Sequence, residues 1–241
     1  MRVNINLIHI NNMSKSITVL IDADSIIFAS AVTSDTILDA KDKMDYKINE
    51  VLDYLSSKYT IDGFSVFSGS KGNFRKFVTD TYKANRRDME IPEHLSALHK
   101  HSKEYWDAKY TYGCETDDLI ASAWYKHSNE GKNVVIVAID KDYLQFPCVM
   151  YNYNKKEFIV QSELDALRAF YTQMVVGDSA DNIKVCKGKG KAFAVKLLDP
   201  LTTKYQMTRA VYELYKTFYK GKAELKYRET FNLLKLRTNV R

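Results

Sequence analysis

The stretch ITVLIDADSIIF, residues 17–28, decides how the rest of the chain is interpreted. Its first five residues are apolar and mostly β-branched, which is typical of a strand buried on both faces of a parallel sheet. Two acids, Asp22 and Asp24, follow at once. An acid directly after such a strand lies at the carboxyl edge of the sheet, where parallel α/β sheets bind their ligands.

Two further apolar runs, residues 64–67 and 134–139, have the same character. Residues 151–160 are expected to form a late hairpin that turns near Asn154. Helical patterns cover residues 36–58, 92–108, 116–130, 162–176, 191–198, 208–219 and 223–236. Strands that alternate with helices predict an α/β fold with a mostly parallel sheet.

The composition is that of an ordinary soluble globular protein. Of the 241 residues, 45% are hydrophobic and 27% are charged, and only three are proline, which excludes collagen-like and low-complexity classes. No apolar run reaches the roughly 20 residues that span a bilayer. The three cysteines are widely spaced and form no CxxC pair, so a reducing compartment is expected.

Charge is distributed unevenly along the chain. The first 181 residues carry 21 Lys/Arg and 26 Asp/Glu, whereas residues 182–241 carry 15 and 4. A basic final quarter on a mildly acidic chain suggests that a polyanion is held at one end of the molecule. Lysines on solvated surface helices would give the same count.

Residues 1–15 are expected to be an N-terminal extension. They lack the basic start, the long apolar stretch and the small-residue cleavage site of a secretory signal. A strand pattern begins soon after Met13, which makes Met13 a candidate start of translation, and an additional edge strand is the alternative.

Acids gather in four places along the sequence. Asp140 and Asp142 follow the third apolar run, as the first acids follow the first run, and GCETDD (113–118) and GDSADN (177–182) each place two acids three positions apart. The candidate set is Asp22, Glu115, Asp117, Asp118, Asp140, Asp142, Asp178 and Asp181. The two clusters also suit the first turn of a helix and a solvated turn, respectively.

Eight carboxylates cannot share a pocket uncompensated, because repulsion and burial would raise their pKa values. Mg²⁺ or Mn²⁺, which prefer hard oxygen ligands, are the expected cofactors. Two such ions about 4 Å apart can activate a water molecule and stabilise a leaving oxygen on phosphorus. The acids therefore predict a two-metal site, provided that they converge in the fold.

Five motifs follow one another in a recognisable order: LIDADSIIF (20–28), FRKFVTDTYKANR (74–86), YGCETDDLIASA (112–123), VAIDKDYLQF (137–146) and GDSADNIKVCKGKGKAFAVKLL (177–198). With them the chain resembles the structure-specific 5′ nucleases: flap endonucleases, the 5′-nuclease domain of bacterial DNA polymerase I, and phage 5′–3′ exonucleases. The resemblance spans nearly everything between residues 16 and 198. The compact size is most similar to a phage-encoded member.

The resemblance implies how the acids divide between two metal sites. Those that match ligands or near-ligands of the first site are Asp22, Glu115, Asp117 and Asp140. Those that match outer-shell or second-site acids are Asp118, Asp142, Asp178 and Asp181.

The resemblance also implies roles for basic residues. Lys83 matches a lysine that contacts the scissile phosphate, and Arg86 is expected to assist it. Arg86 and Arg87 lie near the basic residues of the family's gateway helix. Tyr82, next to Lys83, is the best candidate for stacking on an unpaired base.

The implied architecture is a PIN-like 5′-nuclease core with a mostly parallel central sheet over residues 16–161. A helical arch insertion is expected at about residues 70–109, and a helical DNA-binding subdomain over residues 162–241, with a helix–hairpin–helix at residues 177–198. In that hairpin the loop residues Lys187, Gly188, Lys189, Gly190 and Lys191 would bring backbone N–H groups and a helix N-terminus to a DNA phosphate.

Two departures from the family pattern stand out. Ser68 and Gly69 occupy positions where the family has an acid after the second strand, so a carboxylate is missing unless Asp24 or Asp80 replaces it. The family also commonly has Pro-Gly-Val after DNI, where this chain has residues 184–186, KVC.

The expected function is a metal-dependent 5′–3′ exonuclease and flap endonuclease that hydrolyses DNA in replication or repair, and also the RNA of RNA–DNA hybrids. The expected partners are DNA with 5′ ends, flaps or nicks. The protein is expected to be a cytoplasmic monomer without membrane attachment, in a bacterial host if it is phage-encoded. Two alternatives stay open: a PIN-like endoribonuclease, and a catalytically weak DNA-structure-binding protein, which Ser68 favours.

Overall fold

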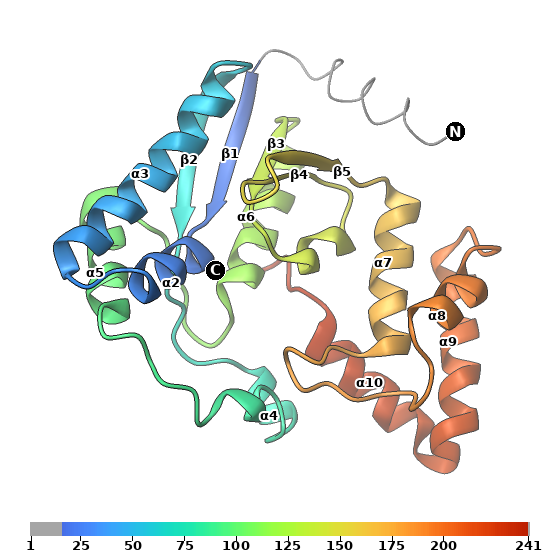
Figure 1. The fold of residues 1–241 in the computed structure, drawn as a ribbon. Coiled ribbons are helices and arrows are strands. Elements are labelled where there is room, and N and C mark those ends of the chain that lie inside the picture. The colour runs from blue at the N-terminus through green and yellow to red at the C-terminus, as the bar shows by residue number, and fades with distance from the viewer. Residues whose placement is uncertain (1–15, 241) are drawn as a thin grey trace.

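The computed structural model of the protein describes residues 16–240, so the extension expected over residues 1–15 lies outside the described residues. Five strands form one sheet in the order β2-β1-β3-β4-β5 (Figure 1). Their bounds are β1 Ser16–Asp22, β2 Thr60–Phe67, β3 Val134–Val137, β4 Val149–Asn152 and β5 Glu157–Val160. The first four strands are parallel and β5 returns antiparallel to β4, which confirms the mostly parallel sheet and the late hairpin.

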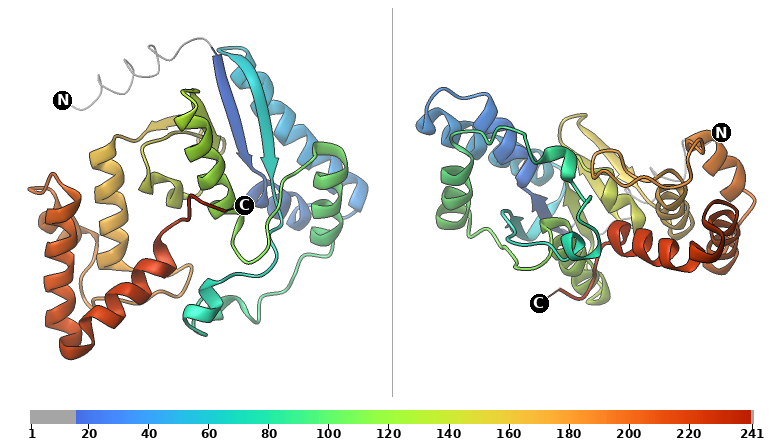
Figure 2. Two further views of the ribbon diagram at one scale, coloured as in Figure 1. Left: turned by 180° about the vertical axis from the view of Figure 1, so that it is seen from behind. Right: turned by 90° about the horizontal axis from the view of Figure 1, so that it is seen from below.

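Alternate residues of the central strands face opposite helical layers. In β1, Val19 and Ile21 pack into the core beneath α2 (Asp24–Val32), α3 (Ile37–Ser56) and α5 (Leu95–Trp106), whereas Leu20 packs toward α6 (Thr116–Asn129). The sheet therefore lies between two helical layers (Figures 1 and 2). Burial on both faces explains why these strands are continuous apolar runs.

Helix α2 is absent from the helices that the sequence predicts. Its sequence, DSIIFASAV, has apolar residues on every side, so no 3.6-residue periodicity distinguishes it from the strand before it. It starts two residues after β1 ends, and this close turn holds Asp22 and Asp24 at the sheet edge.

The segment expected to be a helical arch is mostly irregular. Between β2 and α5 it contains only α4 (Arg75–Val78) and a 3₁₀ turn at Ala84–Arg86, followed by a long loop (Figure 1). Helix α5 packs against α2 and α3, because its Leu98 is fully buried in their shared core. The expected helix over residues 92–108 is therefore shorter, and it belongs to a layer of the core.

The remaining helices form a second group beside the sheet, coloured orange and red in Figure 1. They are α7 (Glu163–Val176), α8 (Lys191–Leu198), α9 (Lys204–Tyr219) and α10 (Ala223–Leu234). Met174, Met207 and Tyr215 are fully buried in the core of this group.

After α10 the chain returns to α6 and the sheet as an extended segment, residues 235–240, which we call the C-terminal strap. It lies on α6 and on the 3₁₀ turn Lys141–Gln145: the N–H of Arg237 donates to Asp118 at 2.9 Å, and that of Leu236 donates to Gln145 at 2.9 Å. No helix within residues 16–240 combines the length and the apolar character needed to cross a membrane.

Candidate active site

A pocket of about 320 Å³ opens beyond the carboxyl ends of β1 and β3. It is acidic: its carboxylates come from Asp22, Asp24, Glu115, Asp117, Asp140, Asp142, Asp178 and Asp181. The pocket thus brings together acids that follow two strands, begin α6 and follow α7. Seven of the eight acids singled out from the sequence line it, and Asp118 does not.

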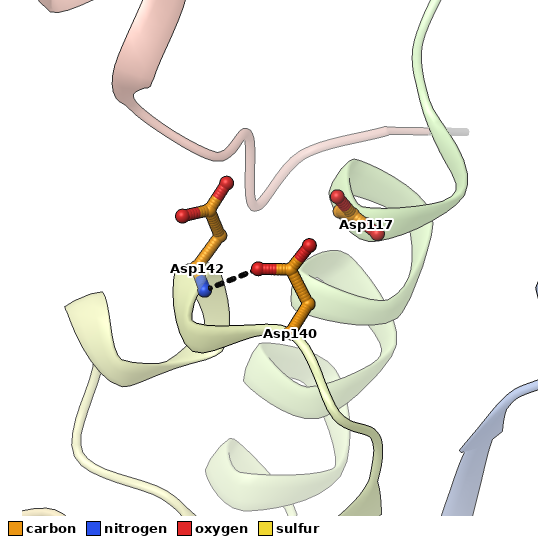
Figure 3. A group of neighbouring side chains, drawn as sticks. All are labelled: Asp117, Asp140 and Asp142. Carbon is orange, nitrogen blue, oxygen red and sulfur yellow. Dashed lines mark hydrogen bonds between the residues drawn. The ribbon is translucent and has the colours of Figure 1, made fainter. Parts of the chain in front are cut away.

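The closest group of carboxylates is Asp117, Asp140 and Asp142, shown in Figure 3. One oxygen from each lies within 4.8 Å of the other two. Asp140 caps the 3₁₀ turn that follows β3, since its Oδ1 accepts the N–H of Asp142 at 2.9 Å. This turn brings both acids toward Asp117, which stands in the first turn of α6.

A buried tyrosine joins this group to Asp22. The hydroxyl of Tyr143 lies 2.8 Å from Asp22 Oδ2 and 2.9 Å from Asp117 Oδ1, and the ring is fully buried. A phenol has one proton and can fully donate to only one acceptor at a time. Both contacts are good hydrogen bonds only when one of the two carboxyls retains a proton.

The pKa values agree with that geometry. Burial, followed by the charge of Asp24, raises the pKa of Asp22 to about 7. Burial, followed by the charge of Asp140, raises the pKa of Asp142 to about 7. Burial and the charge of Asp22 raise the pKa of Asp117 well above its usual value.

This donor set fits a divalent cation. All of the grouped donors are carboxylate oxygens, the ligand type that Mg²⁺ and Mn²⁺ prefer. Burial, followed by repulsion between neighbouring carboxylates, raises the pKa values of Asp22 and Asp117, and a bound cation offsets that repulsion.

Glu115 is held by donors from the segment between β2 and α5. Its Oε2 accepts from the hydroxyl of Tyr82 at 2.8 Å and from Nη1 of Arg75 at 3.2 Å, and its Oε1 accepts from the ammonium of Lys83. Lys83 has a left-handed backbone (φ 52°), and its N–H donates to the carbonyl of Asp181 at 3.0 Å. Burial opposes the charge of Lys83, but Glu115 and Asp181 outweigh it and raise the lysine's pKa.

The loop after α7 brings two acids and their cations to the opposite side of the pocket. Asp181 accepts from Nη2 of Arg86 at 2.9 Å, and Asp178 pairs with Lys141 at 2.9 Å. Gly177 makes the loop possible: its φ is +78°, and a Cβ there would lie 2.2 Å from the carbonyl oxygen of Ile183.

Asp118, expected as an outer-shell or second-site acid, does not line the pocket and is therefore not placed as a direct metal ligand. Its carboxylate is fully buried and forms a bidentate pair with Arg75, at 2.6 and 2.9 Å, behind the pocket. Its oxygens also accept from the N–H groups of Glu115 and Arg237. It therefore builds the start of α6, whose N-cap is Glu115.

Tyr82 is not placed to stack on an unpaired base, contrary to the expectation from the sequence. Its side chain is 3% exposed and packs into the core of the second helical group, while its hydroxyl bonds to Glu115 and Asp181. A ring enclosed in this way offers no face to an unpaired base.

The position of the missing acid is occupied by a buried serine. Ser68 is fully buried, with its Oγ 2.6 Å from Oγ of Ser102. Asp24 does line the pocket, and it accepts from the N–H of Gly69 at 2.8 Å and from the hydroxyl of Thr116 at 2.7 Å. Asp80, the other suggested replacement, is exposed and is not part of the pocket lining.

The glycine–lysine loop lies at the surface between α7 and α8. Gly188 has a left-handed backbone, Gly190 is the N-cap of α8, and Lys189 lies partly over the ring of Phe193, with 4.2 Å from its Nζ to the ring centroid. Lys187, Gly188, Gly190 and Lys191 are exposed. Arg87, the remaining candidate for DNA contact, is exposed on the segment before α5.

Three residues that shape the pocket were not singled out from the sequence. Tyr143 bridges two acids, Arg75 holds Glu115, and the side-chain amide of Gln173 donates to Asp142. For Tyr143 and Arg75, the available signal was their place inside the motifs VAIDKDYLQF and FRKFVTDTYKANR. Gln173 lies in α7 and carries no such signal.

Comparisons with known proteins agree with this site. The family described as "5'-3' exonuclease, N-terminal resolvase-like domain" matches residues 17–186. A 5'-3' exonuclease of Buchnera aphidicola subsp. Schizaphis graminum is 30% identical over 130 residues, which are 49% of this chain and 45% of that protein. Flap endonuclease Xni of Shewanella frigidimarina is 28% identical over 163 residues, 61% of this chain and 62% of that protein. Each match therefore spans less than two thirds of the relative.

A solved structure has the same fold. The bacteriophage T5 flap endonuclease, in a pseudo-enzyme–product complex with DNA and metal ions, superposes with a TM-score of 0.60 at 12% identity, covering 90% of this chain and 99% of that one. The family match includes the five strands of the sheet, α6 and the acids of the pocket up to Asp181. The chain belongs to the 5'-3' exonuclease family defined by this N-terminal resolvase-like domain.

Proposed function

We propose that the protein is a metal-dependent 5′ nuclease that hydrolyses phosphodiester bonds of DNA. The observation that carries the proposal is the meeting of Asp22, Asp117 and Asp140 from three distant segments in one pocket, beside Lys83. Such a pocket offers oxygen ligands for cations and a cation for phosphate, the two requirements of phosphodiester hydrolysis by this route.

The cofactors we propose are two Mg²⁺ or Mn²⁺ ions. Asp117, Asp140 and Asp142 would hold one ion with Asp22 and Glu115 beside them, and Asp178 would contribute to the second. When bound, these ions supply Lewis-acid activation of water and neutralise charge on the phosphate.

Lys83 and Arg86 would bind the scissile phosphate. In the structure their cationic groups are paired with Glu115 and Asp181 at the pocket wall. A phosphate that enters the pocket competes for these cations, which then neutralise the negative charge that develops on the phosphoryl oxygens. Until metal binds, Asp22 and Asp117 would share one proton. The hydroxyl of Tyr143 would then donate to one carboxyl and accept from the other.

We propose that the substrate is DNA with a 5′ end, flap or nick, held by the second helical group. The exposed loop formed by residues 187–191 and the basic final quarter of the sequence support contact with the phosphate backbone of a duplex. The division into a core at residues 16–161 with an arch at about 70–109 and a helical subdomain at 162–241 belongs to this proposal. Action as a monomer and on RNA–DNA hybrids also belongs to it.

The test is a cleavage assay with three labelled substrates: a 5′-flap duplex, a blunt duplex and a single-stranded RNA. Each is incubated with the protein in Mg²⁺, Mn²⁺ or EDTA, with Asp117→Asn as a control for contaminating nucleases. We expect metal-dependent cleavage that is fastest on the flap. Binding without cleavage in either metal at several pH values would instead favour the catalytically weak DNA-binding alternative, and preferential RNA cleavage would favour the endoribonuclease.

A further inference from the structure

Arg75 connects three parts of the molecule through one buried guanidinium group. Its side chain is 1% exposed. It donates to Asp118 at 2.6 and 2.9 Å, to Glu115 at 3.2 Å, and to the carbonyls of Leu233 and Lys235 at 2.8 and 3.2 Å. These contacts use all five N–H donors of an arginine.

Arg75 lies between two helix ends of opposite polarity. The carboxyl end of α10 favours a cation, and the amino end of α6 favours an anion. Leu233 and Lys235 lie at the carboxyl end of α10, where carbonyls lack intrahelical partners and positive charge is favourable. Asp118 lies in the first turn of α6, where negative charge is favourable. Arg75 thus ties the end of α10 to the start of α6, whose N-cap is Glu115.

The contact of Arg75 with Glu115 fixes where the Glu115 carboxylate lies more than it changes the electrostatic potential there. Arg75 and Asp118 form a bidentate pair that is neutral as a whole, so the pair contributes little net field at the pocket. It does determine where Oε2 of Glu115 lies, together with the hydroxyl of Tyr82.

We propose that Arg75 is a positioning residue of the metal site, which holds Glu115 in place and makes that placement depend on the seating of the carboxyl end of α10. α10 packs against α4 and belongs to the second helical group. A shift of that group when it holds DNA would therefore reach Glu115 through Arg75, in addition to the contact that Tyr82 makes from the core of the same group. The consequence for catalysis rests on the proposed function, whereas the consequence for metal binding does not.

Two variants that keep the charge balance test the proposal. Arg75→Met/Asp118→Leu removes both members of the pair, and buried ion pairs are often replaced by apolar residues without loss of stability. Arg75→Lys keeps the charge but lacks the planar fork that binds two partners at once. Three quantities are measured for each variant. They are the Mn²⁺ affinity, from electron paramagnetic resonance of the free ion, the rate of 5′-flap cleavage at saturating Mn²⁺, and the flap affinity in EDTA.

We expect both variants to bind Mn²⁺ about tenfold or more weakly, and to cleave more slowly even at saturating Mn²⁺, with unchanged flap affinity. Ser122→Ala is the matched control. Ser122 also grips the strap, through the carbonyl of Arg237 and the N–H of Val240, but has no contact with Glu115. It is expected to lower the melting temperature and to leave Mn²⁺ affinity unchanged.

Parental Mn²⁺ affinity in the folded double variant would overturn the proposal, and so would equal weakening in Ser122→Ala. If Arg75→Lys does not fold, the double variant decides. If the parent protein binds Mn²⁺ but cleaves none of the substrates, the proposed function fails, and the Mn²⁺ titration still decides the role of Arg75.

Discussion

Tyr143 links the protonation of two carboxyls in the pocket before metal binds. Its hydroxyl lies between Asp22 and Asp117 and joins the two carboxylates. Asp22 also accepts the N–H of Asp24 at 3.2 Å, so it is Asp117 that depends most on this one phenol and on cations from solution. The chemistry of the site therefore rests on a few atoms whose loss has measurable effects.

Asp140→Asn is expected to reduce turnover of a 5′ flap by about a hundredfold or more while flap affinity stays within a few-fold. Asp140 is one of the three grouped carboxylates, so the amide removes a charged metal ligand without changing shape. Single-turnover kinetics and fluorescence anisotropy measure the two quantities. Asp107→Asn, at a side chain that is 89% exposed, is the control and should behave as the parent. Parental turnover in Asp140→Asn would show that the site is assigned wrongly.

The stability of the metal-free protein is expected to fall as pH rises from about 4 to about 7. Burial raises the pKa of Asp22 and of Asp142 from 3.8 to about 7, so the folded state binds these protons more tightly than the unfolded state. Stability is then greatest below the unfolded pKa and decreases by at most about 1.4 kcal/mol per pH unit for each group. Above pH 7 the contribution of these two groups is lost.

Urea unfolding in EDTA at pH 5, 6 and 7 measures this dependence. Asp22→Asn should give a flatter profile, because one of the two groups no longer titrates. Excess Mn²⁺ should reverse the trend, since the cation binds the deprotonated carboxylates. A free energy of unfolding that rises with pH in EDTA would contradict the assigned pKa shifts.

Individual residues could be predicted from the sequence where their position in an element determines their place. Asp22 and Asp140 follow buried parallel strands, and both lie in the pocket. Asp118 and Tyr82 could not be placed, because orientation within a turn depends on a buried partner far away in sequence. For Asp118 that partner is Arg75, 43 residues earlier, and for Tyr82 it includes Asp181, 99 residues later.

At the scale of elements, the loop after α7 depends on one glycine. Gly177 allows the close approach to Ile183 that brings Asp178 and Asp181 to the pocket. The loop closes with two short backbone hydrogen bonds between Asp178 and Ile183, at 2.7 and 2.9 Å.

Gly177→Ala is expected to destabilise the protein by about 3 kcal/mol or more, because a left-handed backbone and a backbone clash act together. Gly188→Ala is the matched control: its φ is +79°, but a Cβ there meets nothing within 4 Å, so only about 1 kcal/mol is expected. Urea unfolding measures both. Equal losses would show that the approach to Ile183 does not constrain the loop.

Elements with a clear period were predicted within a few residues, and the others were not. Helix α8 has the expected bounds, Lys191–Leu198, and α3 is close to the expected span. Helix α2 was missed because it has apolar residues on every side. The irregular segment between β2 and α5 has no period of its own, since its residues are held by contacts such as that of Arg75 with α10.

At the scale of the whole molecule, the basic residues of the final quarter of the sequence gather in one part of the fold. The basic final quarter of the sequence contains α8, α9 and α10, which form one group beside the sheet (Figure 2). The loop between α7 and α8 contributes Asp178 and Asp181 to the acidic pocket. A polyanion attracted to these helices is thus brought to a pocket that repels it until cations bind.

Lys189→Ala/Lys191→Ala is expected to weaken duplex binding and to reduce the slope of log affinity against log salt by about 1 to 2. Fluorescence anisotropy from 50 to 200 mM KCl measures the slope. Lys100→Ala/Lys103→Ala on α5 is the control with equal loss of charge, because α5 covers the other end of the sheet. An unchanged slope in the first variant would remove the loop from the DNA interface.

The pocket draws its acids from Asp22 near the start of the chain to Asp181 in the loop after α7. No contiguous portion of the polypeptide holds the complete set until about three quarters of it has emerged from the ribosome. A chain whose synthesis stops before Asp181 is therefore expected to lack the proposed nuclease activity, a safeguard that arises from connectivity alone.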